Sequence, residues 1–326
     1  MNRLAIIGGG AWGTALAIVA ARAGSAVTLW ARDPAVVAAI NHGHENPLFL
    51  PGITLDPAVS ATTELQTAIF GAEAALLVVP AQFLRSALAS LAPMLPVAMP
   101  LLLCAKGIET DSLQTMSELA AEILPQSPVA VLSGPSIAAE VARGLPTAVT
   151  IASQEPAIAR AFVAALGNSR FRPYLSEDPV GVELGGAVKN VIAIAGGIVE
   201  GRGLGNNAHA ALIPRGLAEM IRLGIAKGAR AETFAGLSGL GDLVLTGTRN
   251  HALGVALGRG ESLDDALAAR QRSVVEGVAT AAAVARLATR LGIEMPITAA
   301  VDAVLHRGLG IDAMIESLLS RPWRSE

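Results

Sequence analysis

The sequence predicts a doubly wound α/β sheet domain at residues 1–177, followed by an all-α domain at residues 178–326. Short apolar runs alternate with alanine-rich helical stretches in the first half, as βαβ units require. From Asp178 onward the periodicity is helical. A chain of 326 residues also exceeds the size at which one hydrophobic core usually stops growing. Together these observations favour two domains.

The first domain is expected to contain strands of a parallel sheet, because its apolar runs do not alternate with polar residues. A helix is expected from residue 11 to Gly24, between the first two strands. The expected strands cover residues 3–8, 26–30, 74–79, 100–105, 129–132 and 147–152.

The second domain is expected to begin with a long helix. Asp178 is a suitable N-cap, and Pro179 suits the first helical position, where no backbone donor is needed. Later helices are expected at about residues 208–228, 249–258, 262–271, 276–291 and 296–307.

Composition and charge favour small-molecule partners. A net charge of −3 with 16% charged residues shows neither the basic excess of a nucleic-acid binder nor the bias of a disordered tail. Glycines interrupt the uncharged run 4–21 and prolines interrupt the run 86–105, so no membrane span is expected. Cys104 is the single cysteine, which fits a reducing compartment, and we expect a soluble, cytoplasmic protein.

The segment "IIGGGAWGTALA" contains a G-x-G-x-x-G pattern formed by Gly8, Gly10 and Gly13. It directly follows an expected strand and opens an expected helix. In this position the glycines permit a tight turn, close approach to a pyrophosphate, and packing of the helix on the strand. The pattern predicts a Rossmann-type dinucleotide site; the alternative is a glycine-rich turn that binds nothing.

The end of the second strand bears on which dinucleotide is bound. Many NAD enzymes place a carboxylate there for the ribose hydroxyls, whereas this chain has Ala31 followed by Arg32. The guanidinium favours NADP. NAD is the alternative, because Asp33 lies about twenty residues after the glycine pattern. We interpret Asp33 rather as the N-cap of a helix that starts at Pro34.

Lysine is rare: Lys106, Lys189 and Lys227 stand against 21 arginines. The pKa of an ammonium falls readily on burial, which suits proton transfer. Lys106 follows an expected strand at the carboxyl edge of the sheet, where ligands of such folds bind. Lys227, beside Gly228, is interpreted as an exposed helix end.

Lys189 lies in an apolar helical stretch whose nearest polar residue is Asn190, so its ammonium is expected to face a cleft rather than bulk solvent. Gly186, Ala193 and Gly196 are expected to leave room for a ligand beside it. The alternative is a lysine whose stem covers apolar surface while its head reaches water.

Several blocks occur in one order through nearly the whole chain. They include "GGGAWGTALA", "LWARDP", "FLPGI", "VVPAQFLR", "CAKGIE", "SGPSIAAEVARGLPTAV", "GVELGGAVKNVIAIAGGIVEG", "AALIPRGLAEM", "FAGLSGLGDLVLT" and "VVEG". In these blocks the chain resembles the bacterial NAD(P)-dependent glycerol-3-phosphate dehydrogenases. The resemblance implies reversible reduction of dihydroxyacetone phosphate to sn-glycerol 3-phosphate for phospholipid synthesis, a C-terminal domain like that of 6-phosphogluconate dehydrogenase, and a homodimer.

The resemblance also implies roles for individual residues. Lys189 would donate and accept the proton and contact the substrate. The other substrate contacts would be Lys106, Gly134, Ser136, Asp242, Thr248, Arg249 and Asn250. The cofactor contacts would be Gly8, Gly10, Ala11, Trp12, Gly13, Arg32, Phe49, Lys106, Ala138, Arg249, Val274 and Glu276. No metal site is expected; His42 and His44 are interpreted as part of a polar loop.

Elementary chemistry agrees with these roles. A hydride that reaches a carbonyl carbon leaves negative charge on the oxygen, where an ammonium supplies a proton and stabilises the charge. The chain departs from the family pattern between Asp242 and Arg249, where it is shorter. Two other functions stay open: a 3-hydroxyacid or 6-phosphogluconate-type dehydrogenase with the same lysine, and a dinucleotide sensor without turnover.

Overall fold

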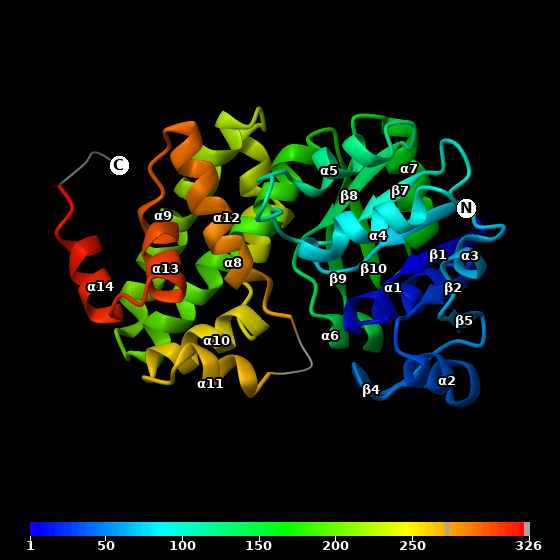
Figure 1. Cartoon of the computed structure of the whole chain (residues 1–326), viewed down its shortest axis with the longest axis horizontal. Coiled ribbons are helices and arrows are strands. Elements are labelled where there is room, and N and C mark those ends of the chain that lie inside the picture. Colours follow the sequence, from blue (N-terminus) through cyan, green and yellow to red (C-terminus); the bar gives the residue numbers. More distant parts are fainter. Residues whose placement is uncertain (271–273, 323–326) are drawn as a thin grey trace.

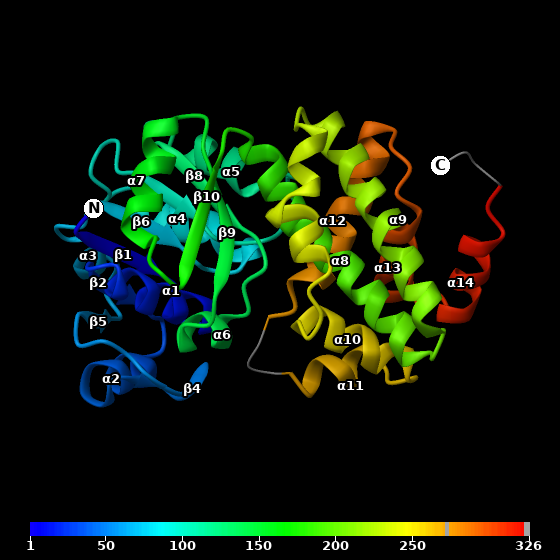
Figure 2. The same ribbon diagram turned by 180° about the vertical axis from the view of Figure 1, so that it is seen from behind.

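The computed structural model describes residues 1–270 and 274–322. Figure 1 shows a sheet covered by helices, which holds the N-terminus, beside a group of helices that ends at the C-terminus. The view from behind shows the same two parts along the longest axis (Figure 2). Among described residues from 178 onward no strand occurs. The predicted fold class, a sheet domain followed by an all-helical domain, is therefore confirmed.

The main sheet has the strand order β10-β9-β8-β7-β6-β1-β2-β5. The six strands from β5 to β8 are parallel, and they have the 3-2-1-4-5-6 order of doubly wound folds, with the reversal between β1 and β6. Their bounds are β1 Arg3–Ile7, β2 Ala26–Trp30, β5 Val59–Thr62, β6 Ala74–Leu77, β7 Leu101–Leu103 and β8 Val129–Ser133. A separate hairpin comprises β3 (Glu45–Asn46) and β4 (Leu50–Thr54).

The expectation that residues 147–152 continue the parallel sheet is wrong. Strand β9 (Thr147–Ala152) pairs antiparallel with β8, and β10 (Phe171–Ser176) runs parallel to β9. Helix α6 (Ala138–Arg143), which joins β8 to β9, has six residues and is about 9 Å long. The helix is too short to carry the chain back to the end of the sheet where β8 begins. Strand β9 therefore begins at the end of the sheet where β8 stops.

Both faces of the sheet are buried, which explains the apolar runs. Leu4 and Ile6 of β1 belong to one core, whereas Ala5 and Ile7 belong to the core on the other face. The first core includes residues of α1 (Ala11–Arg22), α2 (Pro34–Gly43), α6 and α7 (Pro156–Leu166). The second includes residues of α3 (Leu65–Ile69), α4 (Leu84–Leu91) and α5 (Met116–Ile123).

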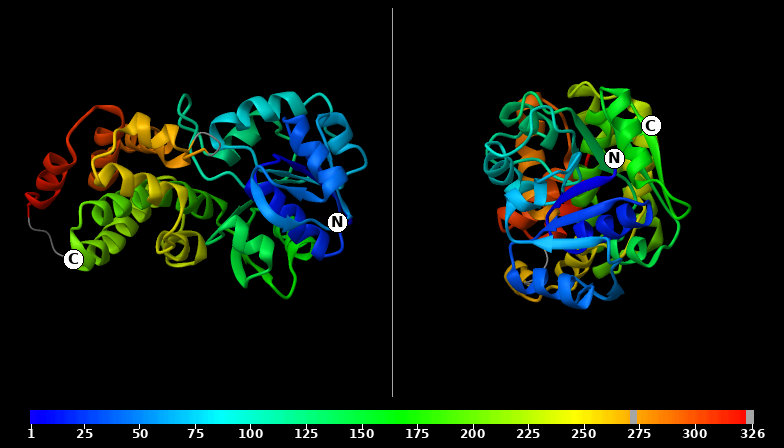
Figure 3. Two further views of the ribbon diagram at one scale, coloured as in Figure 1. Left: turned by 90° about the horizontal axis from the view of Figure 1, so that it is seen from below. Right: turned by 90° about the vertical axis from the view of Figure 1, so that its right-hand side faces the viewer.

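Helix α8 (Pro179–Gly201) is the core of the helical part. In the described chain it is the one helix long and apolar enough to cross a membrane, but 89% of its most apolar window is buried inside the fold. Seen from below, the helical part lies next to the sheet part (Figure 3). The other helices are α9 Gly205–Ala226, α10 Arg249–Gly258, α11 Leu263–Ala268, α12 Glu276–Leu291, α13 Pro296–His306 and α14 Ile311–Leu319. Short turns form η1 (Ala81–Phe83), η2 (Ala231–Ala235) and η3 (Leu237–Gly241).

The predicted start of α8 is confirmed by its cap. Asp178 accepts a hydrogen bond from the backbone N–H of Gly181 at 2.9 Å, and its other oxygen accepts from the hydroxyl of Thr233 at 2.6 Å. Helix α10 packs closely on α8, because a Cβ at Gly254 would lie 2.1 Å from the carbonyl oxygen of Ile194. This contact places the middle of α10 against the C-terminal half of α8.

The interpretation of Lys227 as an exposed helix end is wrong in part. Lys227 follows the last residue of α9, as expected. Its side chain is only 18% exposed, however, because its ammonium pairs with Glu118 of α5. This ion pair joins the helical part to the sheet part.

Candidate active site

Two lysines share one carboxylate where the sheet meets the helical part. Nζ of Lys106 donates to Oδ2 of Asp242 at 2.6 Å, and Nζ of Lys189 lies 3.0 Å from Oδ1. Lys106 follows β7, Lys189 lies on α8, and Asp242 directly follows η3. Lys106 also donates to the carbonyl oxygen of Gly134 at 2.8 Å, which ties the group to the end of β8.

The ammonium of Lys189 is buried rather than in bulk solvent, as the sequence predicts, with 6% of the residue exposed. Burial is the largest influence and lowers its pKa below the ordinary value. The positive charges of Lys106 and Arg249 act in the same direction, whereas the carboxylate of Asp242 opposes them. The result is an ammonium that releases its proton more readily than a lysine in water does.

The expectation that Gly186 leaves room for a ligand is wrong. A Cβ at this position would lie 2.4 Å from Oγ of Ser133 and 3.4 Å from Cγ of Lys106. The glycine instead lets α8 approach the end of β8, which brings Lys189 to the carboxyl edge of the sheet. At Gly196 a Cβ would meet its nearest neighbour, the ring of His209, at an ordinary 3.7 Å.

A chain of buried amides links the segments that carry the site. Asn190 donates to the carbonyl oxygen of Lys106 at 3.1 Å, and Asn250 donates to Oδ1 of Asn190 at 2.8 Å. Oδ1 of Asn250 in turn accepts from the backbone N–H of Gly277 at 2.8 Å. The amide of Asn250, expected as a substrate contact, therefore joins α8 to α12 in this structure.

The other residues expected at the substrate differ in their surroundings. Thr248 is the N-cap of α10 and accepts from the backbone N–H of His251 at 3.2 Å. Arg249 is exposed, yet it lies close enough for its charge to lower the pKa of both Lys189 and Glu276. Ser136 is partly buried and donates to the carbonyl oxygen of Gly134 at 2.8 Å.

Glu276 opens α12 and contacts the turn after β6. Its carboxylate accepts from the backbone N–H of Ala81, at 3.3 and 3.4 Å for the two oxygens. Burial raises its pKa to about 7. Val274, two residues earlier, is 45% exposed.

The glycine loop fits a dinucleotide phosphate. Gly8 has a φ of +132°, and a Cβ on it would lie 2.8 Å from the backbone of Val78, which follows β6. A Cβ on Gly13 would lie 1.8 Å from the carbonyl oxygen of Gly8, so this glycine lets α1 pack on β1. Around Gly10, the N-cap of α1, a Cβ would meet nothing within 4 Å. Open backbone at a helix N-terminus is what an anion requires.

Other expected cofactor contacts lie in the same sheet domain. Ala11, Trp12, Phe49 and Ala138 are partly buried and pack against one hydrophobic core. Arg32 is exposed just after β2. The interpretation of Asp33 as an N-cap is confirmed, since it accepts from the backbone N–H of Ala35 at 2.9 Å.

Sequence reasoning missed two buried polar residues near the site. Ser133, at the end of β8, has an Oγ atom without a hydrogen-bond partner among the described residues. Glu183 of α8 accepts from the backbone N–H of Ser117 at 2.7 Å and from its hydroxyl at 2.6 Å, and burial raises the pKa of Glu183 to about 7. The burial of Glu183 could have been predicted from the sequence, because Glu183 is a single acidic residue within an apolar helical stretch.

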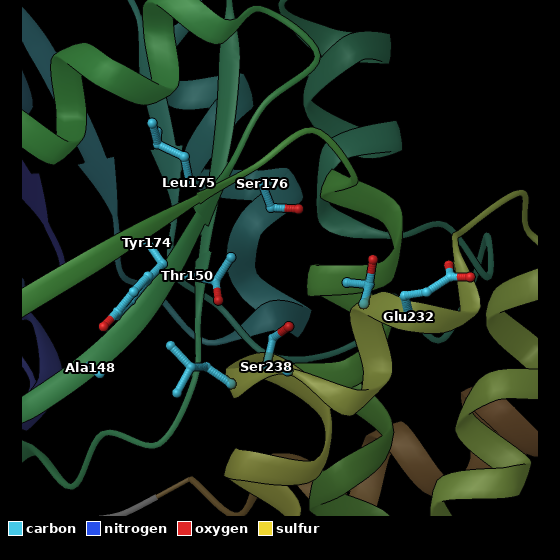
Figure 4. Close-up of a pocket in the computed structure, with 10 residues that line it drawn as sticks. Ala148, Thr150, Tyr174, Leu175, Ser176, Glu232 and Ser238 are labelled. Atoms are coloured by element: carbon cyan, nitrogen blue, oxygen red, sulfur yellow. The ribbon is translucent and has the colours of Figure 1, made fainter.

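A separate hollow of about 390 Å³ lies between strands β9 and β10 on one side and η2 and η3 on the other. Figure 4 shows Thr150, Tyr174 and Glu232 among its lining residues. It is lined by no lysine or arginine, so it lacks the groups that bind a phosphate ester. In the residues that the structure describes, no three His, Cys, Asp or Glu side chains are grouped so as to hold a metal ion.

Comparison with known proteins bears on the identity of this site. The family model of the NAD-dependent glycerol-3-phosphate dehydrogenase N-terminus matches residues 3–159, and that of the C-terminus matches residues 178–316. Glycerol-3-phosphate dehydrogenase (NAD(P)+) of Rhodospirillum rubrum is 58% identical over 100% of this chain and 94% of its own length. That of Caulobacter vibrioides is 55% identical over 100% and 99%.

A solved structure of glycerol-3-phosphate dehydrogenase from Coxiella burnetii has a TM-score of 0.94 and 40% identity, and the match covers 98% of this chain and 99% of that chain. Sequence and structure therefore agree over the full length. The chain belongs to the family of NAD-dependent glycerol-3-phosphate dehydrogenases.

Proposed function

We propose that the chain catalyses the reversible, NAD(P)H-dependent reduction of dihydroxyacetone phosphate to sn-glycerol 3-phosphate. The observation that carries this proposal is the pairing of Lys106 and Lys189 with Asp242 at the carboxyl edge of a dinucleotide-binding sheet. Membership of the family supplies the substrate and the reaction.

Lys189 is the proton donor in the reductive direction. NAD(P)H, when bound, supplies a hydride to the carbonyl carbon of the substrate. The ammonium of Lys189 gives a proton to the oxygen on which negative charge develops, and its lowered pKa favours the transfer. Asp242 holds the ammonium in place, and Lys106 adds a second positive charge that stabilises the developing oxyanion. In the oxidative direction the neutral amine of Lys189 accepts the proton.

The remaining roles follow from the positions of the residues. Residues 1–177 bind the dinucleotide, and residues 178–326 supply Lys189, Asp242 and the phosphate contacts. Arg249 offers a planar, charged donor for the substrate phosphate. The other substrate contacts are Gly134, Ser136, Thr248 and Asn250, and the cofactor contacts are the glycine loop with Ala11, Trp12, Arg32, Phe49, Lys106, Ala138, Arg249, Val274 and Glu276. Arg32 gives a preference for NADP over NAD.

An assay of nicotinamide absorbance tests the function. We expect the purified chain to oxidise NADPH when dihydroxyacetone phosphate is added but not when a 3-keto acid is added, and not to reduce NADP+ when 6-phosphogluconate is added. Turnover with a carboxylated substrate alone would assign a related dehydrogenase. Binding of NADPH without turnover of any of these substrates would assign a sensor.

The assembly and the location are further parts of the proposal. The family resemblance supports a homodimer, which light scattering on the purified chain measures. The buried, reduced Cys104 is compatible with the cytoplasm, where sn-glycerol 3-phosphate serves phospholipid synthesis. A fluorescent fusion of the chain tests that location.

A further inference from the structure

One asparagine outside the expected site residues holds the dinucleotide loop. Asn46 of β3 is 0% exposed. Its side-chain N–H groups donate to the carbonyl oxygen of Gly9 at 3.0 Å and to Oγ1 of Thr14 at 2.8 Å. Its Oδ1 accepts from the backbone N–H of Phe49 at 3.3 Å. Both amide donors and the acceptor are therefore in use.

The contact with Gly9 acts on a peptide group at the open N-terminus of α1. The carbonyl of Gly9 and the N–H of Gly10 belong to one planar, trans peptide and point in opposite directions. Fixing the carbonyl oxygen therefore fixes the direction of the N–H of Gly10. That N–H lies at the open N-terminus of α1, where the loop offers its donors to a phosphate.

A loop of consecutive glycines needs such a constraint. Gly8, Gly9 and Gly10 have no Cβ atoms to restrict their backbone angles. On one side Ala31 restricts the position of the loop, because a Cβ at Gly9 would lie 2.5 Å from the Cβ of Ala31. Asn46 limits it on the other side, and a loop that is already ordered loses less entropy when a ligand binds.

The same side chain also holds the segment of Phe49, which is expected to contact the cofactor. Thr14 lies on α1 and Phe49 lies between β3 and β4, so Asn46 joins the glycine loop, its helix and the hairpin. We propose that Asn46 is a positioning residue that presets the glycine loop and the Phe49 segment for the dinucleotide. This inference rests on the proposed function in one respect, namely that the glycine loop binds NAD(P)H.

The test compares Asn46→Ala with Asn41→Ala. Asn41 provides a matched control, because its amide also makes two hydrogen bonds to backbone, with the carbonyl and the N–H of Ala61 at 2.9 and 2.8 Å, away from the loop. We expect Asn46→Ala to raise the dissociation constant of NADPH about tenfold, the equivalent of one well-made hydrogen bond. The KM for NADPH should rise with it. At saturating NADPH, kcat and the KM for dihydroxyacetone phosphate should change by less than about twofold.

Thermal unfolding separates a positioning role from a structural one. Asn41→Ala should lower the melting temperature but leave NADPH affinity unchanged. Should Asn46→Ala fail to fold, Thr14→Val removes one of its partners, and we expect NADPH to bind about threefold more weakly. Unchanged NADPH affinity in the folded Asn46 variant, or in Thr14→Val if that variant is needed, would overturn the inference. So would an equal loss of affinity in Asn41→Ala. If the unaltered chain binds no NADPH, the proposed function fails instead.

Discussion

The ammonium of Lys189 lies 3.0 Å from a carboxylate oxygen of Asp242, and both residues are buried. An isolated buried charge is costly, so each of these groups depends on the other. The second oxygen of Asp242 binds Lys106, which places two positive charges on one negative charge. The excess positive charge suits a site in which an oxyanion forms and a phosphate is bound.

The pH profile of the reductive reaction should report these charges. The rate falls as the pH rises through the pKa of Lys189, because the proton donor is lost. Asp242→Asn removes the charge that raises this pKa, so the alkaline limb of kcat/KM should move to lower pH. Lys106→Met removes a charge that lowers it, so the limb should move to higher pH. Shifts in the same direction in both variants would contradict the assignment.

Arg32 should decide between the two nicotinamides. A guanidinium at the end of β2 binds the 2′-phosphate of NADP by charge-assisted hydrogen bonds. Arg32→Ala should therefore weaken the binding of NADPH about tenfold or more, while the affinity for NADH changes little. Titration of NADPH and NADH against the unaltered chain and the Arg32→Ala variant measures these affinities. An equal loss of affinity for the two nucleotides would exclude phosphate recognition by Arg32.

Two glycines of the loop should respond differently to an added methyl group. Gly13→Ala places a Cβ 1.8 Å from the carbonyl oxygen of Gly8, so the free energy of unfolding should fall by about 1–3 kcal/mol. Gly10→Ala meets no neighbour and keeps an ordinary φ of −75°, so stability should hold. Its methyl group occupies the open side of the loop, however, and NADPH should bind more weakly. Melting curves and NADPH titrations on the two variants distinguish packing from binding.

Glu183 should make stability depend on pH. Its pKa is raised from 4.5 to about 7 in the folded protein, so the folded state holds this proton more tightly than the unfolded state does. The stabilisation is complete below pH 4.5 and is lost as the pH rises to about 7. The loss amounts to at most about 3–4 kcal/mol, since each pKa unit corresponds to about 1.4 kcal/mol.

Urea unfolding at several pH values measures this effect. Glu183→Gln should flatten the fall in the free energy of unfolding across that range. Glu122→Gln is the control, because the pKa of exposed Glu122 is lowered and its removal leaves the fall in place. An unchanged slope in Glu183→Gln would show that other carboxyl groups cause the dependence.

Local patterns predicted the parts of the fold that local physics determines. The glycine pattern predicted the β1–α1 turn, Asp178 and Pro179 predicted the start of α8, and the apolar surroundings of Lys189 predicted its burial. In the first two cases neighbours within one or two turns decide the conformation, whereas the burial of Lys189 follows from the packing of an apolar helix inside the fold.

Contacts between distant segments could not be predicted in this way. Lys106 and Asp242 are 136 residues apart, and they pair because the helical part packs against the carboxyl ends of the sheet strands. The reversal of β9 depends on the length of α6, whereas the strand itself has the same apolar pattern as its parallel neighbours. The role of Asn46 was missed because two of its partners, Gly9 and Thr14, lie 37 and 32 residues away in the sequence.

Turnover by a Lys189→Met variant tests the central claim most directly, since methionine keeps most of the length of the side chain but has no titratable proton. Lys227→Met is the matched control, because Lys227 pairs with Glu118 away from Asp242. We predict that Lys189→Met lowers kcat for dihydroxyacetone phosphate at least about a hundredfold, with NADPH affinity nearly unchanged, whereas Lys227→Met keeps normal turnover. A Lys189→Met enzyme that reduces dihydroxyacetone phosphate at the normal rate would contradict the account.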